Sequence, residues 1–176
     1  MPIDIKSREY ECWHEAGHAL VCLLGGGKVE LMEIIKDEEH FGRARALCET
    51  TDESRPYIAC GGFAAEYQLY KSGLLNVSER EFVQNALTNA FPDKAKFFGA
   101  DYEEDDGCWP SEMDVQFRDF SIYKVAPMLE DNFSLLSELA ETLLENEYLS
   151  ESQISDIAKK HNKTNQHVPQ KLLRIS

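Results

Sequence analysis

The segment over residues 4–24 constrains the fold most, because a strong helical pattern in it ends abruptly. Its apolar positions recur at the spacing of successive helical turns, at Tyr10, Trp13, Gly17, Val21 and Leu24. Asp4 or Ser7 is suited to cap its start, and three consecutive glycines stop it. His14 and His18 lie four residues apart, so they share one face of such a helix. The segment therefore predicts an amphipathic helix that presents two imidazole rings side by side.

The rest of the pattern predicts an α+β fold that leans towards all-α. Two short strands are expected over 29–35 and 43–47, joined by a polar hairpin loop. Further helices are expected from 54 or 56 to 70, over 78–90, from 111 onwards with a kink at Pro127, over 133–145, and from 150 or 152 to 161. The chain length indicates a single domain over 1–176. We expect a small two- or three-stranded sheet and a C-terminal helical bundle.

Two segments lack a helical or strand pattern. Residues 92–110 are expected to form an acidic insertion loop, because five acids lie between Asp101 and Asp106. Residues 162–176 are expected to be a frayed tail.

Composition narrows the classes of partner. The chain has 18 Lys and Arg against 32 Asp and Glu, a net charge of −14, which argues against nucleic acid and against anionic membranes. The acidity favours solubility, or alternatively a preference for basic segments of a substrate or partner. No stretch approaches the roughly 20 apolar residues that span a bilayer, and no signal peptide is visible.

The cysteines point to a reducing environment. There are five of them, scattered and without a Cys-x-x-Cys pair. This pattern argues against a disulfide framework and against a cysteine zinc cluster. A cytoplasmic location is the expectation.

The motif His14-Glu15-Ala16-Gly17-His18 indicates a metal site. Two histidines four apart on a helix can hold one Zn²⁺ ion, and a catalytic zinc site keeps a position for water. Glu15 is then placed to accept a proton from that water, which would attack a carbonyl. The alternative is a surface helix that carries two histidines and a glutamate by chance. Gly17 weakens this alternative, since a helical glycine costs stability unless another backbone approaches closely.

Four segments, in order, resemble the protease domain of FtsH-type ATP-dependent zinc metalloproteases. Residues 14–20 are similar to its zinc motif, and residues 28–47 to the strand pair that follows. Residues 61–66 resemble its Gly-Gly-Arg-Ala-Ala-Glu segment, with Phe63 in place of the arginine. Residues 139–149 are similar to its C-terminal helix and turn. The resemblance implies a zincin-like, mostly helical peptidase domain.

The resemblance also suggests the third zinc ligand, which in the family is an aspartate near the start of a later helix. Asp114 matches that position best, although it could instead cap the helix that begins at Ser111. Glu66 is the second candidate, and its alternative is a carboxylate that is paired elsewhere. The remaining histidines, His40, His161 and His167, are expected to be solvated.

Departures from the family pattern limit the functional expectation. The chain has no phosphate-binding loop of an ATPase and no membrane anchor. The stretch over 67–110 is longer than in the family, and Phe63 puts a family salt bridge or subunit contact in doubt. The expected function is a stand-alone zinc metalloendopeptidase that acts on peptides or unfolded protein. The alternatives are a non-catalytic metal-binding or regulatory module, and a protease subunit that works with a separate ATPase. Expected partners besides the substrate are a second copy of the chain, in a homo-oligomer, or that ATPase.

Overall fold

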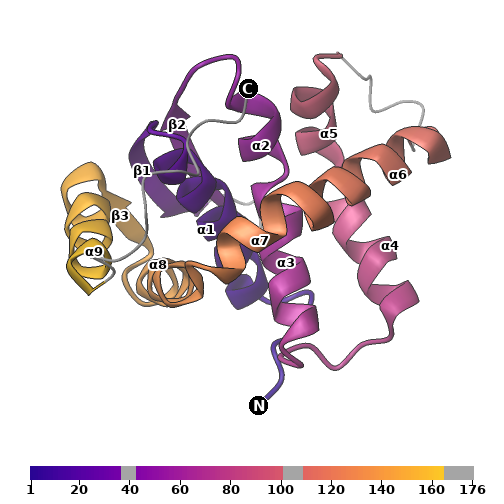
Figure 1. Ribbon diagram of the computed structural model, residues 1–176. Helices are drawn as coiled ribbons and strands as arrows, with labels where there is room; N and C mark the ends of the chain where they lie inside the picture. Colours follow the sequence, from indigo (N-terminus) through magenta and orange to yellow (C-terminus); the bar gives the residue numbers. More distant parts are fainter. Residues whose placement is uncertain (37–42, 101–108, 165–176) are drawn as a thin grey trace.

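The computed structural model describes residues 1–36, 43–100 and 109–164, and these residues form a mostly helical fold with one small sheet (Figure 1). The α+β expectation is confirmed. The helices are α1 (Arg8–Leu24), α2 (Arg55–Ala59), α3 (Gly61–Lys71), α4 (Glu79–Asn89), α5 (Phe91–Phe98), α6 (Ser111–Phe120), η2 (Ser121–Val125), α7 (Ala126–Glu130), α8 (Phe133–Asn146) and α9 (Glu151–Thr164). The strands are β1 (Lys28–Ile34), β2 (Ala44–Glu49) and β3 (Tyr148–Ser150).

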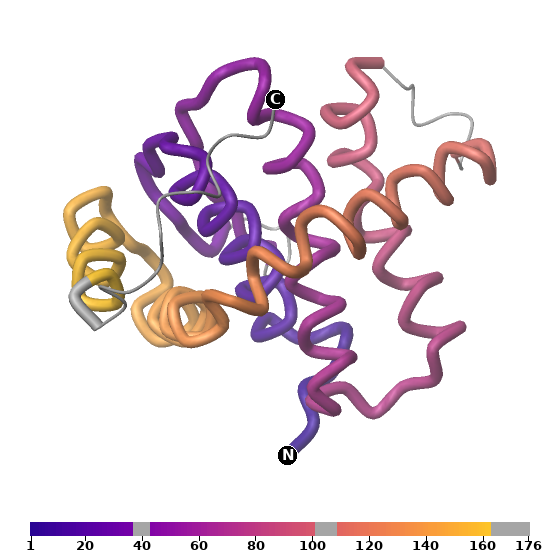
Figure 2. Tube along the Cα trace, in the orientation of Figure 1, coloured from indigo at the N-terminus to yellow at the C-terminus, as the bar shows by residue number. Residues whose placement is uncertain are grey.

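Helix α1 is the element around which the others pack, with α3 and α8 beside it and the sheet against it (Figure 2). Ser7 caps its start, since the Ser7 hydroxyl accepts a hydrogen bond from the Tyr10 amide at 3.2 Å. The helix ends at Gly25. The predicted first helix is therefore confirmed, and the cap is Ser7 rather than Asp4.

Two glycines explain how closely α1 approaches α3. A Cβ on Gly17 would lie 2.1 Å from the Gly61 carbonyl oxygen, and a Cβ on Gly61 would lie 2.6 Å from the Gly17 carbonyl oxygen. The two helices thus pack backbone against backbone, which only glycine permits. This confirms the close approach that the glycines inside predicted helices indicated.

The sheet is antiparallel, with the strand order β2-β1-β3. Lys28 pairs with Glu49 and Ile34 with Ala44, while Glu33 pairs with Tyr148 on the other side. The sheet thus has three strands, within the two or three expected, although the sequence did not locate β3, which has only three residues. Among the described strands β2 lies at an edge of the sheet and packs against α1 (Figure 1). The predicted hairpin loop at 37–42 lies outside the described residues.

Residues 92–110 are not all loop as expected, because α5 occupies Phe91–Phe98. Pro92 stands in its first turn, where a missing amide hydrogen costs nothing, and Gly99 ends it with a φ of 62°. Residues 101–108, which hold the acidic run, lie outside the described part of the chain. The tail expectation also needs correction, since α9 continues to Thr164.

The helix predicted from 111 is interrupted before Pro127, as expected. A π-helical turn, η2, separates α6 from α7. Proline cannot donate a backbone hydrogen bond to the preceding turn, and a wider turn is one way to accommodate this. The predicted helix from 54 or 56 to 70 is likewise divided, into α2 and α3, at Cys60.

Two of the cysteines are joined, contrary to the expectation of an entirely reduced set. Cys22 on α1 and Cys48 on β2 form a disulfide, because the packing of α1 against the sheet brings them together. Cys12 and Cys60 are buried free thiols, and Cys108 lies outside the described residues. No helix in the described ranges is long and apolar enough to cross a membrane.

Candidate metal centre

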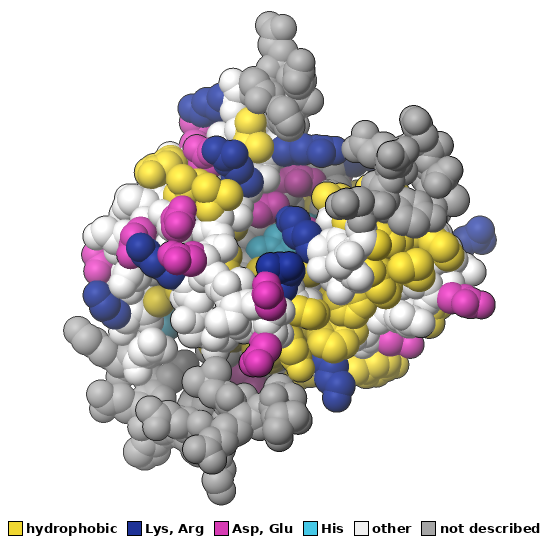
Figure 3. Space-filling model, turned by 90° about the horizontal axis from the view of Figure 1, so that it is seen from above, with side chains coloured by type: hydrophobic (Ala, Val, Ile, Leu, Met, Phe, Trp, Pro, Cys, Tyr) yellow, Lys and Arg dark blue, Asp and Glu magenta, His cyan; other side chains and the backbone are white. Residues whose placement is uncertain are grey.

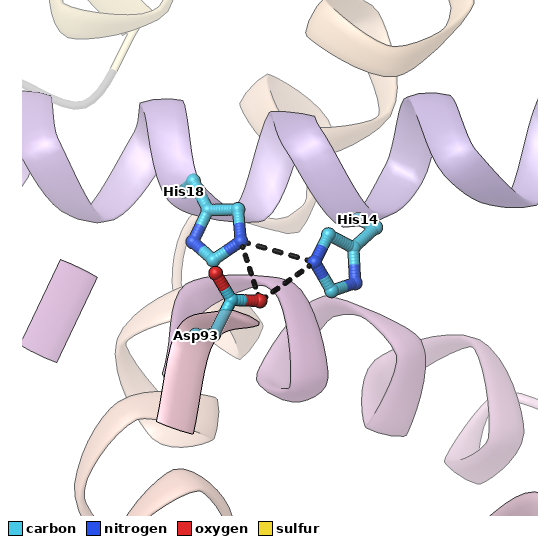
Figure 4. Close-up of side chains that lie close together, drawn as sticks. All are labelled: His14, His18 and Asp93. Carbon is cyan, nitrogen blue, oxygen red and sulfur yellow. Dashed lines mark hydrogen bonds and ion pairs between the residues drawn. The ribbon is translucent and has the colours of Figure 1, made fainter. Parts of the chain in front are cut away.

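Three side chains from two helices meet at the centre of the candidate site (Figure 4). His14 and His18 extend from α1, and Asp93 from the first turn of α5. The His14 and His18 Nε2 atoms are 3.0 Å apart, and Asp93 Oδ2 lies 3.1 Å from the first and 3.3 Å from the second. His14 and Asp93 are almost entirely buried. Among the described residues, these three form the group that could hold a metal ion.

The hydrogen bonds of the two histidines fix which nitrogen faces the centre with a lone pair. His18 Nδ1 lies 2.6 Å from the Ile58 carbonyl oxygen, which can only accept, so Nδ1 carries the proton. His14 Nδ1 lies 2.6 Å from Glu66 Oε1 and donates to that carboxylate in the same way. When the rings are neutral, they therefore turn the lone pairs of both Nε2 atoms towards Asp93 Oδ2. Three acceptors this close repel each other unless a proton or a cation lies between them.

The spacing of these atoms fits a zinc ion. Tetrahedral coordination at 2.0–2.1 Å places neighbouring ligand atoms about 3.3 Å apart. The three measured separations, 3.0 to 3.3 Å, are close to this value. Two imidazoles and one carboxylate are also a donor set that zinc commonly takes, with a fourth position for water. The residues present thus fit a zinc ion.

Charges around the cluster shift the pKa of all three side chains. Burial lowers the pKa of both imidazoles, but Glu66 and Asp93 at His14, and Asp93 at His18, outweigh it and raise both pKa values. Burial raises the pKa of the Asp93 carboxyl, yet His18 and His14 hold it well below its usual range. The cluster therefore attracts positive charge, which protons or a metal ion can supply.

Glu66 orients His14 from behind. It is fully buried in α3, and its Oε1 also accepts a hydrogen bond from Asn89 Nδ2 at 2.6 Å. Gly62, one turn earlier in α3, makes room for the ring, since a Cβ there would lie 2.3 Å from His14 Nε2. A carboxylate on the far nitrogen of a metal-binding histidine fixes its tautomer and orientation. Glu66, the second candidate for the third ligand, thus contacts the nitrogen of His14 that faces away from the centre.

Glu15 lines the same cleft as the cluster and is held by the sheet. Its Oε2 accepts a hydrogen bond from the Ala46 amide of β2 at 2.8 Å. Burial raises the pKa of Glu15 more than His18 and His14 lower it. A carboxylate with a raised pKa is better matched to accepting a proton near neutral pH.

Asp114, the predicted third ligand, lies elsewhere and is replaced at the cluster by Asp93. Asp114 Oδ1 accepts a hydrogen bond from the buried Lys94 ammonium at 2.5 Å, which ties α6 to α5. Lys94 follows Asp93 in α5, and successive helical residues point in different directions. The same short helix therefore directs Asp93 to the histidines and Lys94 to Asp114.

Asp93 was missed because its segment was interpreted as loop. The signal was present, since Pro92 just inside the start and Gly99 just past the end are typical of a short helix. His161 was also misjudged as solvated, because its Nε2 lies 2.6 Å from Glu138 Oε2. His40 and His167 lie outside the described residues.

The cluster opens into a cleft of about 1060 Å³. Its described lining comes from α1, from β2 and its approach, and from the facing ends of α2, α4 and α5. Seen from above, a histidine lies at the bottom of a hollow in the surface (Figure 3). The cleft is large enough for a peptide segment of a few residues.

No protein-family model matches the chain, and no curated protein sequence matches it.

Proposed function

We propose that the protein is a zinc-dependent peptidase that hydrolyses peptide bonds in the cleft above His14, His18 and Asp93. The observation that carries the proposal is the convergence of three lone-pair donors at zinc spacing, with Glu15 beside them in an open cleft. The resemblance to FtsH-type peptidase domains, which stays a prediction, agrees with this reading.

Each polar group of the site has a task in hydrolysis. A zinc ion, when bound, supplies the Lewis acidity that lowers the pKa of water and polarises a carbonyl group. Glu15 accepts the proton of the attacking water and returns it to the leaving amine. The Ala46 amide holds the Glu15 carboxylate in place between these transfers. Glu66 keeps His14 in the tautomer that presents Nε2 to the metal.

The edge strand β2 supports a peptide as the substrate. Residues 44–48 of this strand line the cleft, and the edge of a sheet offers backbone amides and carbonyls to an extended chain. A peptide added along β2 would pass over the metal cluster, because the Ala46 amide already reaches Glu15. This geometry favours an extended, unfolded segment over a folded protein.

The test is the pair of variants Glu15→Gln and Glu9→Gln. Glu9 stands in the first turn of α1 and outside the cleft lining, so it is a matched control on the same helix. We expect Glu15→Gln to retain zinc, measured by metal analysis, and to lose about a hundredfold or more of its activity on a pool of unfolded peptides. Glu9→Gln should stay within a fewfold of the wild type. Cleavage by Glu15→Gln at the wild-type rate would exclude Glu15 as the base, and a zinc-loaded wild type that cleaves nothing would favour a non-catalytic module.

A further inference from the structure

Basic side chains gather at the cleft, although the chain as a whole is acidic. Among the described residues that line it, four are Lys or Arg: Arg43, Arg45, Arg55 and Lys96. The acids among these lining residues are Glu11, Glu15 and Asp93. In the view from above, Lys and Arg side chains stand around the hollow in which a histidine is visible (Figure 3). The net charge of the whole chain, −14, therefore does not describe its candidate site.

Two of the three acids that line the described part of the cleft are engaged by other groups, whereas its bases extend into solvent. Asp93 faces the two histidines, and Glu15 accepts from the backbone of β2. The side chains of Arg45, Arg55 and Lys96 are 52%, 60% and 63% exposed. Bound zinc would add two further positive charges, so that the cleft becomes a cationic hollow on an anionic protein.

The existing partners of these bases are weak competitors for a ligand. Arg45 pairs with Glu33, Arg55 with Asp52, which is 88% exposed, and Lys96 Nζ lies 3.4 Å from Asp93 Oδ1. The Arg55–Asp52 pair is exposed on both sides, so water and salt screen it and it contributes little. A ligand carboxylate can therefore replace Asp52 at Arg55 at small cost, and it can share Arg45 and Lys96 with their present partners.

The four basic residues of the cleft would flank a substrate peptide that binds along β2. Arg43 precedes that strand and Arg45 lies two residues further along it, so both point to the same face of the strand. Arg55 begins α2 and Lys96 lies in α5, two helices that pack against each other. Carboxylates on either side of a scissile bond would thus find a base within the cleft.

We propose that the cleft selects acidic peptide segments, with Asp or Glu side chains close to the bond over the metal cluster. This inference rests on the proposed peptidase function and names its substrate class. It reverses the preference for basic segments that the acidity of the whole chain suggested. A cleft lined by one sign of charge focuses the potential and raises the local concentration of ligands of opposite sign.

The proposal is tested by binding, separately from catalysis. Zinc-loaded Glu15→Gln protein is titrated with two fluorescent peptides of equal length, one with Glu and one with Lys flanking the same central residues. We expect the Glu peptide to bind about tenfold tighter or more, and this advantage to shrink as salt rises from about 0.05 to 0.5 M. Equal affinities, or tighter binding of the Lys peptide, would overturn the proposal.

The double variant Arg43→Glu/Arg55→Glu tests whether the preference for the Glu peptide comes from the basic residues of the cleft. We expect it to lose most of the preference for the Glu peptide while its zinc content is unchanged. The matched control is Arg80→Glu/Lys124→Glu, which changes the net charge equally at exposed residues outside the cleft lining and should retain the preference. An equal loss in both variants would assign the effect to overall charge and exclude the cleft.

Tighter binding of a single-stranded oligonucleotide of equal negative charge than of the Glu peptide would overturn the peptide assignment.

Cleavage by the wild-type protein separates the proposed acidic selectivity from the proposed peptidase function. A peptide pool cleaved preferentially next to acidic residues supports both. If the pool is cleaved without charge preference, the peptidase function stands and the acidic selectivity is refuted. No cleavage, with tight and cleft-dependent binding of the Glu peptide, refutes the peptidase and retains the selection.

Discussion

At the scale of single residues, the sequence analysis considered Asp114 both as a metal ligand and as a structural acid, whereas the structure gives these positions to two different aspartates. Asp93 brings a carboxylate to the histidines, whereas Asp114 neutralises a buried lysine. Both stand in the first turn of a helix, where a carboxylate also interacts favourably with the helix dipole. Position in a helix therefore does not distinguish a metal ligand from a structural acid, and only the three-dimensional partners do.

The different partners of Asp93 and Asp114 predict different effects for the same substitution by asparagine: one should lower zinc affinity and the other stability. Asp93→Asn removes the charge of the proposed third ligand, so zinc affinity should fall by more than the roughly 10- to 100-fold typical of outer-shell changes. Asp114→Asn should leave zinc affinity within a fewfold of the wild type and lower the free energy of unfolding by about 1–3 kcal/mol, because Lys94 loses a charged partner. Competition with a chromophoric chelator measures the first quantity, and denaturant unfolding the second. Unchanged zinc affinity in Asp93→Asn would exclude Asp93 from the site.

At the scale of elements, the close contact between glycines of α1 and α3 determines where His14 and Glu66 lie relative to each other. Gly17 lies between the two histidines in the sequence, and Gly61 precedes Gly62, over which the His14 ring lies. Close packing of the two backbones brings Glu66 to His14 Nδ1. The two glycines thus help to position the His14 ring as well as to pack the core.

Gly17→Ala should consequently disturb both stability and metal binding. Its Cβ would lie 2.1 Å from a backbone oxygen of α3, and backbone cannot move aside as a flexible side chain does. We expect the free energy of unfolding to fall by about 1–3 kcal/mol or more, as for other overpacked cores. Zinc affinity should fall as well, because α3 would carry Glu66 away from His14. Ala19→Gly, two residues further along the same helix, controls for a change of size alone: it should cost stability by leaving space in the core, and retain zinc. A Gly17→Ala protein with wild-type stability would contradict the packing.

The disulfide joins two elements that both border the cleft. Cys22 lies one turn beyond His18 on α1, and Cys48 lines the cleft from β2. The bond therefore attaches the edge strand to the helix that carries the histidines. Their separation of 26 residues makes such a pairing invisible to any local pattern.

At the scale of the whole molecule, the sequence predicted what periodicity can predict. Helix α1 and helix α8 were expected because their apolar residues recur over several turns, and the two histidines followed from α1 alone. Helix α5 was missed because it has eight residues and adjoins an acidic run, so its pattern is short. The partners of Asp93, Glu66 and Lys94 depend on how α3, α5 and α6 pack, which no local signal contains.

The candidate centre also connects much of the molecule, because its side chains and their partners come from five helices. His14 and His18 lie on α1, Asp93 on α5, and their hydrogen-bond partners on α2, α3 and α4. A metal ion that binds the folded chain alone stabilises it by mass action, by about 2.7 kcal/mol at 100 times its Kd. Removal of zinc by a chelator should therefore lower Tm by about 5–10 °C for a chain of this size.

The stabilisation by zinc should itself depend on pH, and its sign follows from the two histidines. Their pKa values are raised in the metal-free fold, so protonated histidines stabilise that fold at low pH, and this contribution is lost as pH rises through the raised pKa values. Zinc requires the neutral rings, so protons compete with it. We expect the difference in Tm between zinc-loaded and metal-free protein to grow as pH rises from about 5.5 to 8, measured by calorimetry at fixed free zinc. The His18→Ala variant should show almost no such difference at any pH. A zinc effect that is independent of pH would place the ion away from the histidines.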